Sequence, residues 1–121
     1  MSEQPMQPEA VRQLVVDAVE DMKAEAVTVL DVRGRTAITD FMVFASGTSR
    51  RHLRSIADRV VEFAKAADLQ PLGVEGEDSS GWILVDLGDA VVHVMLPEVR
   101  DFYRLEHIWA VDDDDEADTA E

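Results

Sequence analysis

Residues 82–96 read WILVDLGDAVVHVML, two runs rich in β-branched and aromatic residues that are separated by Gly88-Asp89. A two-residue connection that contains glycine is typical of a tight turn between antiparallel strands. Such a turn fixes the register of the pair and sets Trp82 opposite Met95. The sequence therefore predicts a β-hairpin together with the pairing of residues across it.

The two faces of this hairpin differ in polarity, because successive side chains of a strand point to opposite faces of the sheet. One face is wholly apolar and is expected to lie under helices: Ile83, Val85, Leu87, Ala90, Val92, Val94 and Leu96. The other face, here called the mixed face, combines apolar groups with a carboxylate and an imidazole: Trp82, Leu84, Asp86, Val91, His93 and Met95. Aromatic anchors with a few polar groups are typical of protein interfaces. We therefore expect a docking surface; in the alternative, another helix covers this face and Asp86 and His93 pair beneath it.

The rest of the chain predicts three helices and three more strands. Apolar residues spaced by three and four predict one helix after Pro8 and another after a cap at Thr48 or Ser49. Strands are predicted at 27–32, 41–45 and 71–75, and a last helix runs from 98 to about 109. The order α-β-β-α-β-β-β-α predicts an α/β fold with a mixed five-stranded sheet packed against three helices.

The last predicted helix carries apolar residues around more than half of its circumference: Val99, Phe102, Tyr103, Leu105, Ile108 and Trp109. A helix with one buried stripe needs fewer apolar residues than this. We therefore expect this helix to be deeply buried or to contact two different surfaces at once. Glu106 falls among them and is expected to pair with Arg100 or His93, or else to lie exposed at the rim.

Length and charge suggest one domain at 9–110, between a flexible lead-in at 1–8 and a disordered acidic tail at 111–121. The formal net charge of the 121 residues is −15, and 112–121 hold seven acids and no base. This charge argues against bare nucleic acid as the primary partner, because phosphate binding needs lysine and arginine. The chain has no cysteine, which excludes disulfides, thiolate metal sites and cysteine nucleophiles. We find no targeting or membrane segment and expect a cytoplasmic protein.

Candidate chemistry is sparse. Asp86 and His93, with Asp89 or Asp40, could form a metal or acid–base site, although a histidine in an apolar strand is more often a hydrogen-bonded structural residue. The segment 46–49 resembles the strand-to-helix junction of nucleotidyltransferases, but the next strand lacks the paired acids that such enzymes need, so a capping role is favoured. We therefore predict no catalytic residue, no cofactor and no metal.

The second predicted helix carries four arginines, several of them near its start: Arg50, Arg51, Arg54 and Arg59. Asp58 and Glu62 share their exposed side, so the sequence favours a solvated face with salt bridges.

Several segments, in order and spacing, resemble the ribosomal silencing factor family, also called the Iojap family. They extend from the end of the first predicted strand to Trp109: Leu30-Asp31-Val32, Thr39-Asp40-Phe41-Met42-Val43, Gly47-Thr48-Ser49 with Arg51, Ile56-Ala57-Asp58, Gly73-Val74-Glu75-Gly76, 82–89, Val92-His93-Val94-Met95 and Arg100-x-Phe102-Tyr103-x-Leu105-Glu106-x-x-Trp109. Single pieces are unspecific, whereas the ordered set is characteristic.

The resemblance implies a nucleotidyltransferase-like fold without catalytic acids, as a homodimer that binds large-subunit ribosomal protein fourteen. Occupying that protein would sterically prevent the small subunit from joining and so repress translation. On this sequence the resemblance gives as partner contacts Glu75, Trp82, Asp86, His93, Met95, Arg100 and Tyr103, with Leu105 and Trp109 as dimer candidates. Two other functions remain open at this point: a small nucleotidyltransferase-like enzyme that uses 46–49 and Asp86, and a dimeric adaptor unrelated to the ribosome.

Overall fold

The computed structural model describes residues 6–77 and 80–104. Along the chain it contains α1 (Pro8–Asp21), β1 (Glu25–Asp31), β2 (Phe41–Ser46), α2 (Arg50–Ala66), β3 (Gly73–Glu77), β4 (Trp82–Asp86), β5 (Ala90–Met95) and α3 (Pro97–Tyr103). This is the predicted order of elements, and the α/β fold class is confirmed.

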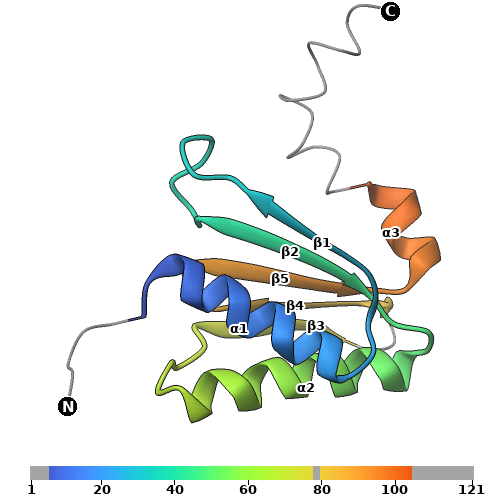
Figure 1. The fold of residues 1–121 in the computed structure, drawn as a ribbon. Coiled ribbons are helices and arrows are strands. Elements are labelled where there is room, and N and C mark those ends of the chain that lie inside the picture. The colour runs from blue at the N-terminus through green and yellow to red at the C-terminus, as the bar shows by residue number, and fades with distance from the viewer. Residues whose placement is uncertain (1–5, 78–79, 105–121) are drawn as a thin grey trace, which may run out of the picture.

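The five strands form one mixed sheet in the order β1-β2-β5-β4-β3 (Figure 1). The central pair, β2 and β5, is parallel, and the other three pairs are antiparallel. The β4–β5 register sets Trp82 opposite Met95 and Leu84 opposite His93, as the Gly88-Asp89 turn predicts.

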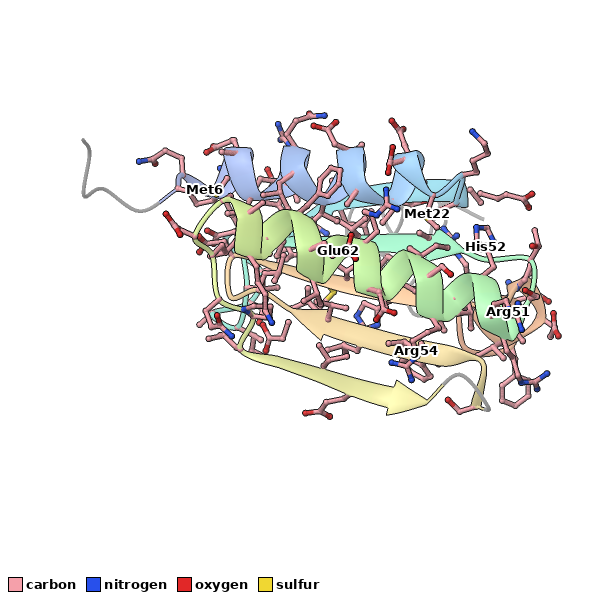
Figure 2. The ribbon with its side chains drawn as sticks, turned by 90° about the horizontal axis from the view of Figure 1, so that it is seen from below. Met6, Met22, Arg51, His52, Arg54 and Glu62 are labelled. Carbon is pink, nitrogen blue, oxygen red and sulfur yellow. The ribbon has the colours of Figure 1, made fainter. Side chains whose placement is uncertain are left out.

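The helices α1 and α2 lie side by side on one face of the sheet (Figures 1 and 2). All seven residues predicted for the apolar face of the hairpin belong to the core beneath them. They pack there with three valines and Ala18 of α1 and with Leu53, Ile56 and Val60 of α2. Burying this continuous apolar surface supplies the main driving force for folding. Every residue of β2 is buried, which confirms the central strand predicted at 41–45.

The junction of β2 with α2 is held by local hydrogen bonds. Ser49 is the N-cap of α2, and its hydroxyl accepts the backbone N–H of His52 at 3.1 Å. The His52 ring accepts the Thr48 N–H at Nδ1 (2.9 Å), so its Nε2 carries the proton and donates to the Met22 carbonyl at 2.7 Å. The imidazole thereby ties the start of α2 to the end of α1.

Several element boundaries differ from the prediction, including that of the first strand, which the sequence predicts at 27–32 and which lies at Glu25–Asp31; two of the differences follow from backbone conformation. The strand predicted at 71–75 lies at Gly73–Glu77, because Gly76 continues the strand with a φ of +93° that only glycine adopts readily. The last helix ends at Tyr103, because Arg104 takes a left-handed conformation with a φ of +52° and its N–H donates to the Arg100 carbonyl. The prediction of one helix from 98 to about 109 is therefore wrong, and residues 105–109 lie outside the described part.

The described helices, of which α2 with 17 residues is the longest, include none that is long and apolar enough to span a membrane. Of the lead-in expected at 1–8, residues 1–5 lie outside the described residues, as does the acidic tail at 111–121, whereas Met6 packs against the main core and Pro8 begins α1.

Candidate functional site

The mixed face lies on the side of the sheet opposite α1 and α2. Among the described helices, only α3 reaches that side, at the end of the sheet where β5 stops (Figure 1). There Val99 of α3 packs against a small second core of Val32, Met42, Phe44 and Met95. The sequence-based alternative, in which another helix covers this face, is therefore not what the described residues form.

Register places one row of side chains straight across the mixed face. Phe44 of β2 pairs with His93 of β5, which pairs with Leu84 of β4, which pairs with Glu75 of β3. The His93 ring stacks on Phe44 with centroids 4.7 Å apart and planes 9° from parallel. Phe44 is a member of the site that sequence alone did not find, because the pairing of β2 with β5 joins segments far apart in the chain.

Trp82 lies two residues before Leu84 on β4, on the same face of the sheet, and its side chain contacts His93 of this row. Its indole Nε1 donates to Nδ1 of His93 at 3.2 Å, and the two ring centroids are 6.0 Å apart. An indole N–H can only donate, so Nδ1 of His93 must be the acceptor and the proton of a neutral imidazole lies on Nε2. Tryptophan, imidazole and phenylalanine thus form a continuous aromatic layer across three strands.

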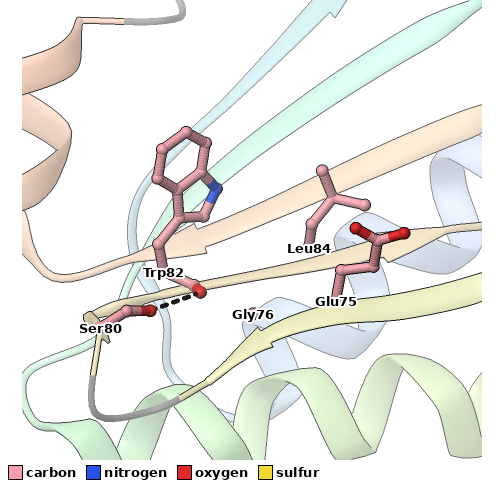
Figure 3. Close-up of a pocket in the computed structure, with 5 residues that line it drawn as sticks. All are labelled: Glu75, Gly76, Ser80, Trp82 and Leu84. Atoms are coloured by element: carbon pink, nitrogen blue, oxygen red, sulfur yellow. Dashed lines mark hydrogen bonds between the residues drawn. The ribbon is translucent and has the colours of Figure 1, made fainter.

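Beside Trp82 the surface is hollowed into a pocket of about 270 Å³, lined by Glu75, Gly76, Ser80, Trp82 and Leu84. Figure 3 shows Trp82, Leu84 and Glu75 rising on the same side of the sheet, with the indole and the carboxylate at opposite ends. Trp82 and Leu84 are half-buried and Glu75 is exposed. An apolar wall with a carboxylate at its rim can accept an apolar side chain flanked by a basic group.

The β5 part of the mixed face is less accessible than the β4 part. Met95 is fully buried and His93 is 6% exposed, because β5 lies between β2 and β4 and large side chains flank it on both sides. Sequence periodicity assigns these residues to the correct face but cannot show how far their neighbours cover them. In this structure they support Trp82 from beneath, and their contact with a partner stays a prediction.

Asp86 serves the hairpin turn. Its Oδ1 accepts the Gly88 N–H at 2.9 Å, and its side chain is half-buried at the far end of β4 from Trp82. The described residues contain no group of three or more histidines or acids arranged to hold a metal ion. The metal site considered for Asp86 and His93 with Asp89 or Asp40 therefore finds no support in this part of the chain.

Arg100 lies inside the fold. It is 8% exposed, and its guanidinium donates to the Ala26 carbonyl (2.6 Å), the Ser46 hydroxyl (2.9 Å) and the Thr28 hydroxyl (2.9 Å). These bonds fasten α3 to β1 and β2, so the structure gives Arg100 a positioning role where the sequence suggested a partner contact. They also occupy Ser46, while Ser49 caps α2, so both serines of 46–49 serve the fold rather than a nucleotidyltransferase-like site.

The remaining predicted contacts lie at or past the end of α3. Tyr103 is the last residue of α3, and its side chain lies outside the described part, as do Leu105, Glu106 and Trp109. Phe102 precedes Tyr103 and is 78% exposed. Sequence patterns did not select Phe102 as a contact, because an apolar residue in a helix signals burial more often than exposure.

Comparison with known proteins gives consistent matches over nearly the whole chain. The family model described as "Ribosomal silencing factor during starvation" matches residues 5–121. A ribosomal silencing factor of Haemophilus influenzae is 37% identical over 101 residues, which cover 84% of this chain and 99% of the relative. Its counterpart in Chromobacterium violaceum is 39% identical over 104 residues, 86% of this chain and 85% of the relative.

Solved structures agree with the fold. A crystal structure of a Chromobacterium violaceum protein superposes with a TM-score of 0.84 at 39% identity, covering 87% of this chain and 88% of that one. The curated relatives are named as silencing factors, which are regulatory proteins, and this confirms the expectation that the chain is not an enzyme. The sequence motifs, the mixed sheet and these matches agree: the chain belongs to the ribosomal silencing factor family.

Proposed function

We propose that this chain represses translation in the cytoplasm by binding large-subunit ribosomal protein fourteen through the mixed face, and that its bulk then blocks the joining of the small subunit. The observation that carries the proposal is the accessible half of the mixed face. There Trp82, Leu84 and Glu75 surround a pocket that α1 and α2 leave uncovered. A half-buried tryptophan beside an apolar hollow is the usual composition of an interface hot spot.

The charge of the chain supports a basic partner. The formal net charge is −15, and Glu75 is an exposed carboxylate at the rim of the pocket. Ribosomal proteins are basic, because they neutralise ribosomal RNA, so complementary potentials would speed encounter and orient the two surfaces. The mechanism is steric occlusion, which needs no catalytic group, cofactor or metal.

The first test is co-sedimentation with isolated large subunits. Wild-type protein should comigrate with them, and Trp82→Ala should weaken binding at least about tenfold, the effect expected of a central aromatic anchor. Glu75→Arg reverses an exposed charge without touching the core, and it should weaken binding while unfolding is unchanged. Leu72→Ala is the matched control, because Leu72 is 72% exposed and lies outside the pocket.

The second test is subunit joining. Wild-type protein added to separated subunits should lower the yield of whole ribosomes, and the Glu75→Arg variant should do so only at higher concentration. If neither Trp82→Ala nor Glu75→Arg changed co-sedimentation with large subunits or the yield of whole ribosomes, the mixed face would be excluded as the docking surface.

The homodimer implied by the family resemblance is a further part of this proposal. We propose that Leu105 and Trp109 contribute to it. Sedimentation velocity of wild-type and Trp109→Ala protein tests this point, and a dimer that persists unchanged in the variant would contradict it.

A further inference from the structure

The start of α3 lies against the start of β4. Leu96 is the N-cap of α3, and its N–H donates to the Gly81 carbonyl at 2.9 Å. A Cβ added at Gly81 would lie only 3.0 Å from Cγ2 of Val99, so Val99 packs closely against the residue that precedes Trp82. Trp82 and Val99 also pack against the same small second core, which includes Met95. The helix α3 therefore adjoins the Trp82 end of the mixed face.

The side chains of α3 point in two directions. Arg100 is directed toward β1 and β2, where its guanidinium donates to groups of both strands. Phe102 comes two residues later, about 200° around the helix, and so lies on the side of α3 away from those strands. It shares this side with Glu98 and Val99, which precede it by four and three residues and are its neighbours on the helix surface. Val99 is half-buried and Phe102 is 78% exposed, so Phe102 extends the apolar surface of Trp82 and Val99 outward along α3.

The position of Phe102 distinguishes it from other exposed apolar residues. Single apolar side chains on a protein surface are common and need no function. Ile38 and Leu72 are exposed to a similar extent, and both lie at the other end of the sheet, where β5 begins. Phe102, by contrast, is joined to Trp82 through Val99. A contiguous apolar patch of this kind is typical of an interface.

Each aromatic residue of the patch is accompanied by an exposed carboxylate. Glu75 lines the pocket beside Trp82, and Glu98 lies one turn before Phe102 on α3. A second copy of this chain docked here would place carboxylates near carboxylates, and each copy carries a net charge of −15. Like charges that face each other across an interface cost several kcal/mol, whereas opposite charges orient the partner. The charges therefore favour a basic protein as the occupant of this patch.

We propose that Phe102 is a second apolar anchor for the basic ribosomal protein that docks over Trp82, and that Glu98 pairs with a basic side chain next to it. This inference rests on the proposed function and extends its docking surface from the sheet onto α3. Contacts at two points on different elements fix the orientation of a bound protein more firmly than one pocket does. Steric occlusion of the small subunit depends on that orientation, which gives the second anchor its use.

Titration of isolated large subunits measures the contribution of Phe102. Phe102→Ala should lower the affinity at least about fivefold, as expected when an aromatic anchor is truncated. Phe102→Leu keeps an apolar side chain and should lose less. Both variants should unfold at the same urea concentration as the wild type, because the ring is largely exposed. Ile38→Ala is the matched control: it truncates a similarly exposed apolar residue in the connection between β1 and β2, and should bind as the wild type does (Figure 1).

A parallel titration with purified large-subunit ribosomal protein fourteen identifies the component that Phe102 contacts. Phe102→Ala should lose as much affinity for the isolated protein as for the large subunit, and Glu98→Arg should weaken both interactions. A loss for the large subunit alone would overturn the inference, because Phe102 would then contact another component. Sedimentation velocity tests the other occupant. If Phe102→Ala dissociated a dimer and left the affinity for large subunits unchanged, the patch would belong to a second copy and the inference would be overturned.

The inference and the proposed function fail in different ways. If Phe102→Ala and Ile38→Ala bound large subunits equally well while Trp82→Ala weakened binding, the second anchor would be excluded and the proposed function would stand. Failure of the wild type to bind large subunits would overturn both.

Discussion

At the scale of single residues, the Trp82 side chain has two roles: it hydrogen-bonds a buried neighbour and it lines the pocket. Its Nε1 donates to His93 at 3.2 Å, while its ring forms a wall of the pocket beside Glu75 and Leu84. Buried polar groups need a partner, so the indole satisfies the imidazole as well as offering apolar area. A change at Trp82 therefore affects the support beneath the surface together with the surface itself, which is why Glu75→Arg is the cleaner probe of docking.

Gly76 fixes the edge of the pocket through its backbone. Its φ is +93°, and a Cβ added there would lie 2.3 Å from the Trp82 carbonyl oxygen. Gly76→Ala should therefore lower the free energy of unfolding by about 2 kcal/mol or more, because both strain and a steric clash oppose the side chain. Urea denaturation measures this, with Gly73→Ala as the control in the same strand. An added Cβ at Gly73 meets no atom within 4 Å, so equal losses in the two variants would contradict the argument.

Asp31 illustrates how exposed charges respond to pH. Hydrogen bonds from the Arg33 guanidinium, and then from its backbone N–H, lower the pKa of the Asp31 carboxyl from 3.8 to about 2. A depressed pKa stabilises the fold above pH 3.8, and that contribution is lost as pH falls toward 2. In a carbon-13 NMR titration, Arg33→Gln should raise the pKa of Asp31 toward 3.8. Glu9→Gln should leave it near 2, and an unchanged pKa in Arg33→Gln would contradict this assignment.

At the scale of elements, α3 depends on one side chain for its position. Arg100 donates to Ala26, Ser46 and Thr28, which joins α3 to β1 and β2. Arg100→Ala should lower the free energy of unfolding by about 2–3 kcal/mol, because it leaves buried acceptors unsatisfied. Arg100→Lys should recover only part of this loss, since one ammonium cannot span three acceptors.

The control for α3 is Arg104→Ala. Arg104 is exposed, and its side chain contacts Asp101 of the same helix, so the free energy of unfolding should change by less than about 0.5 kcal/mol. Calorimetry or urea denaturation of Arg100→Ala, Arg100→Lys and Arg104→Ala measures these changes in the free energy of unfolding. A loss at Arg100→Ala as small as that at Arg104→Ala would show that α3 is held by its apolar contacts alone.

Sequence predicts elements well where a local signal determines them. The Gly88-Asp89 turn determines the β4–β5 register, and alternation then assigns each residue of 82–96 to the correct face. Sequence fails where a boundary depends on backbone conformation, as at Gly76 and Arg104. The candidate site divides in the same way: Trp82 and Glu75 are accessible as expected, whereas the burial of His93 and Met95 depends on β2 lying beside β5, which no local pattern reveals.

At the scale of the whole molecule, the two sides of the sheet have different tasks. The side under α1 and α2 holds the main core, while the side opposite carries the mixed face with α3 at one end. In the proposed function, a chain with a net charge of −15 approaches a basic ribosomal protein in a preferred orientation, because complementary charges steer the encounter. The bound chain is proposed to obstruct the small subunit sterically, without any chemical step.

The absence of cysteine in the chain allows a direct test of docking through the mixed face. A photo-crosslinker attached to Glu75→Cys, beside the pocket, should link the protein to large-subunit ribosomal protein fourteen when isolated large subunits are added. The same group attached to Lys65→Cys, at the C-terminal end of α2 on the opposite face, should not do so. Mass spectrometry identifies the linked component. Crosslinks from Lys65→Cys with none from Glu75→Cys, or from Glu75→Cys to a different component, would contradict docking through the mixed face.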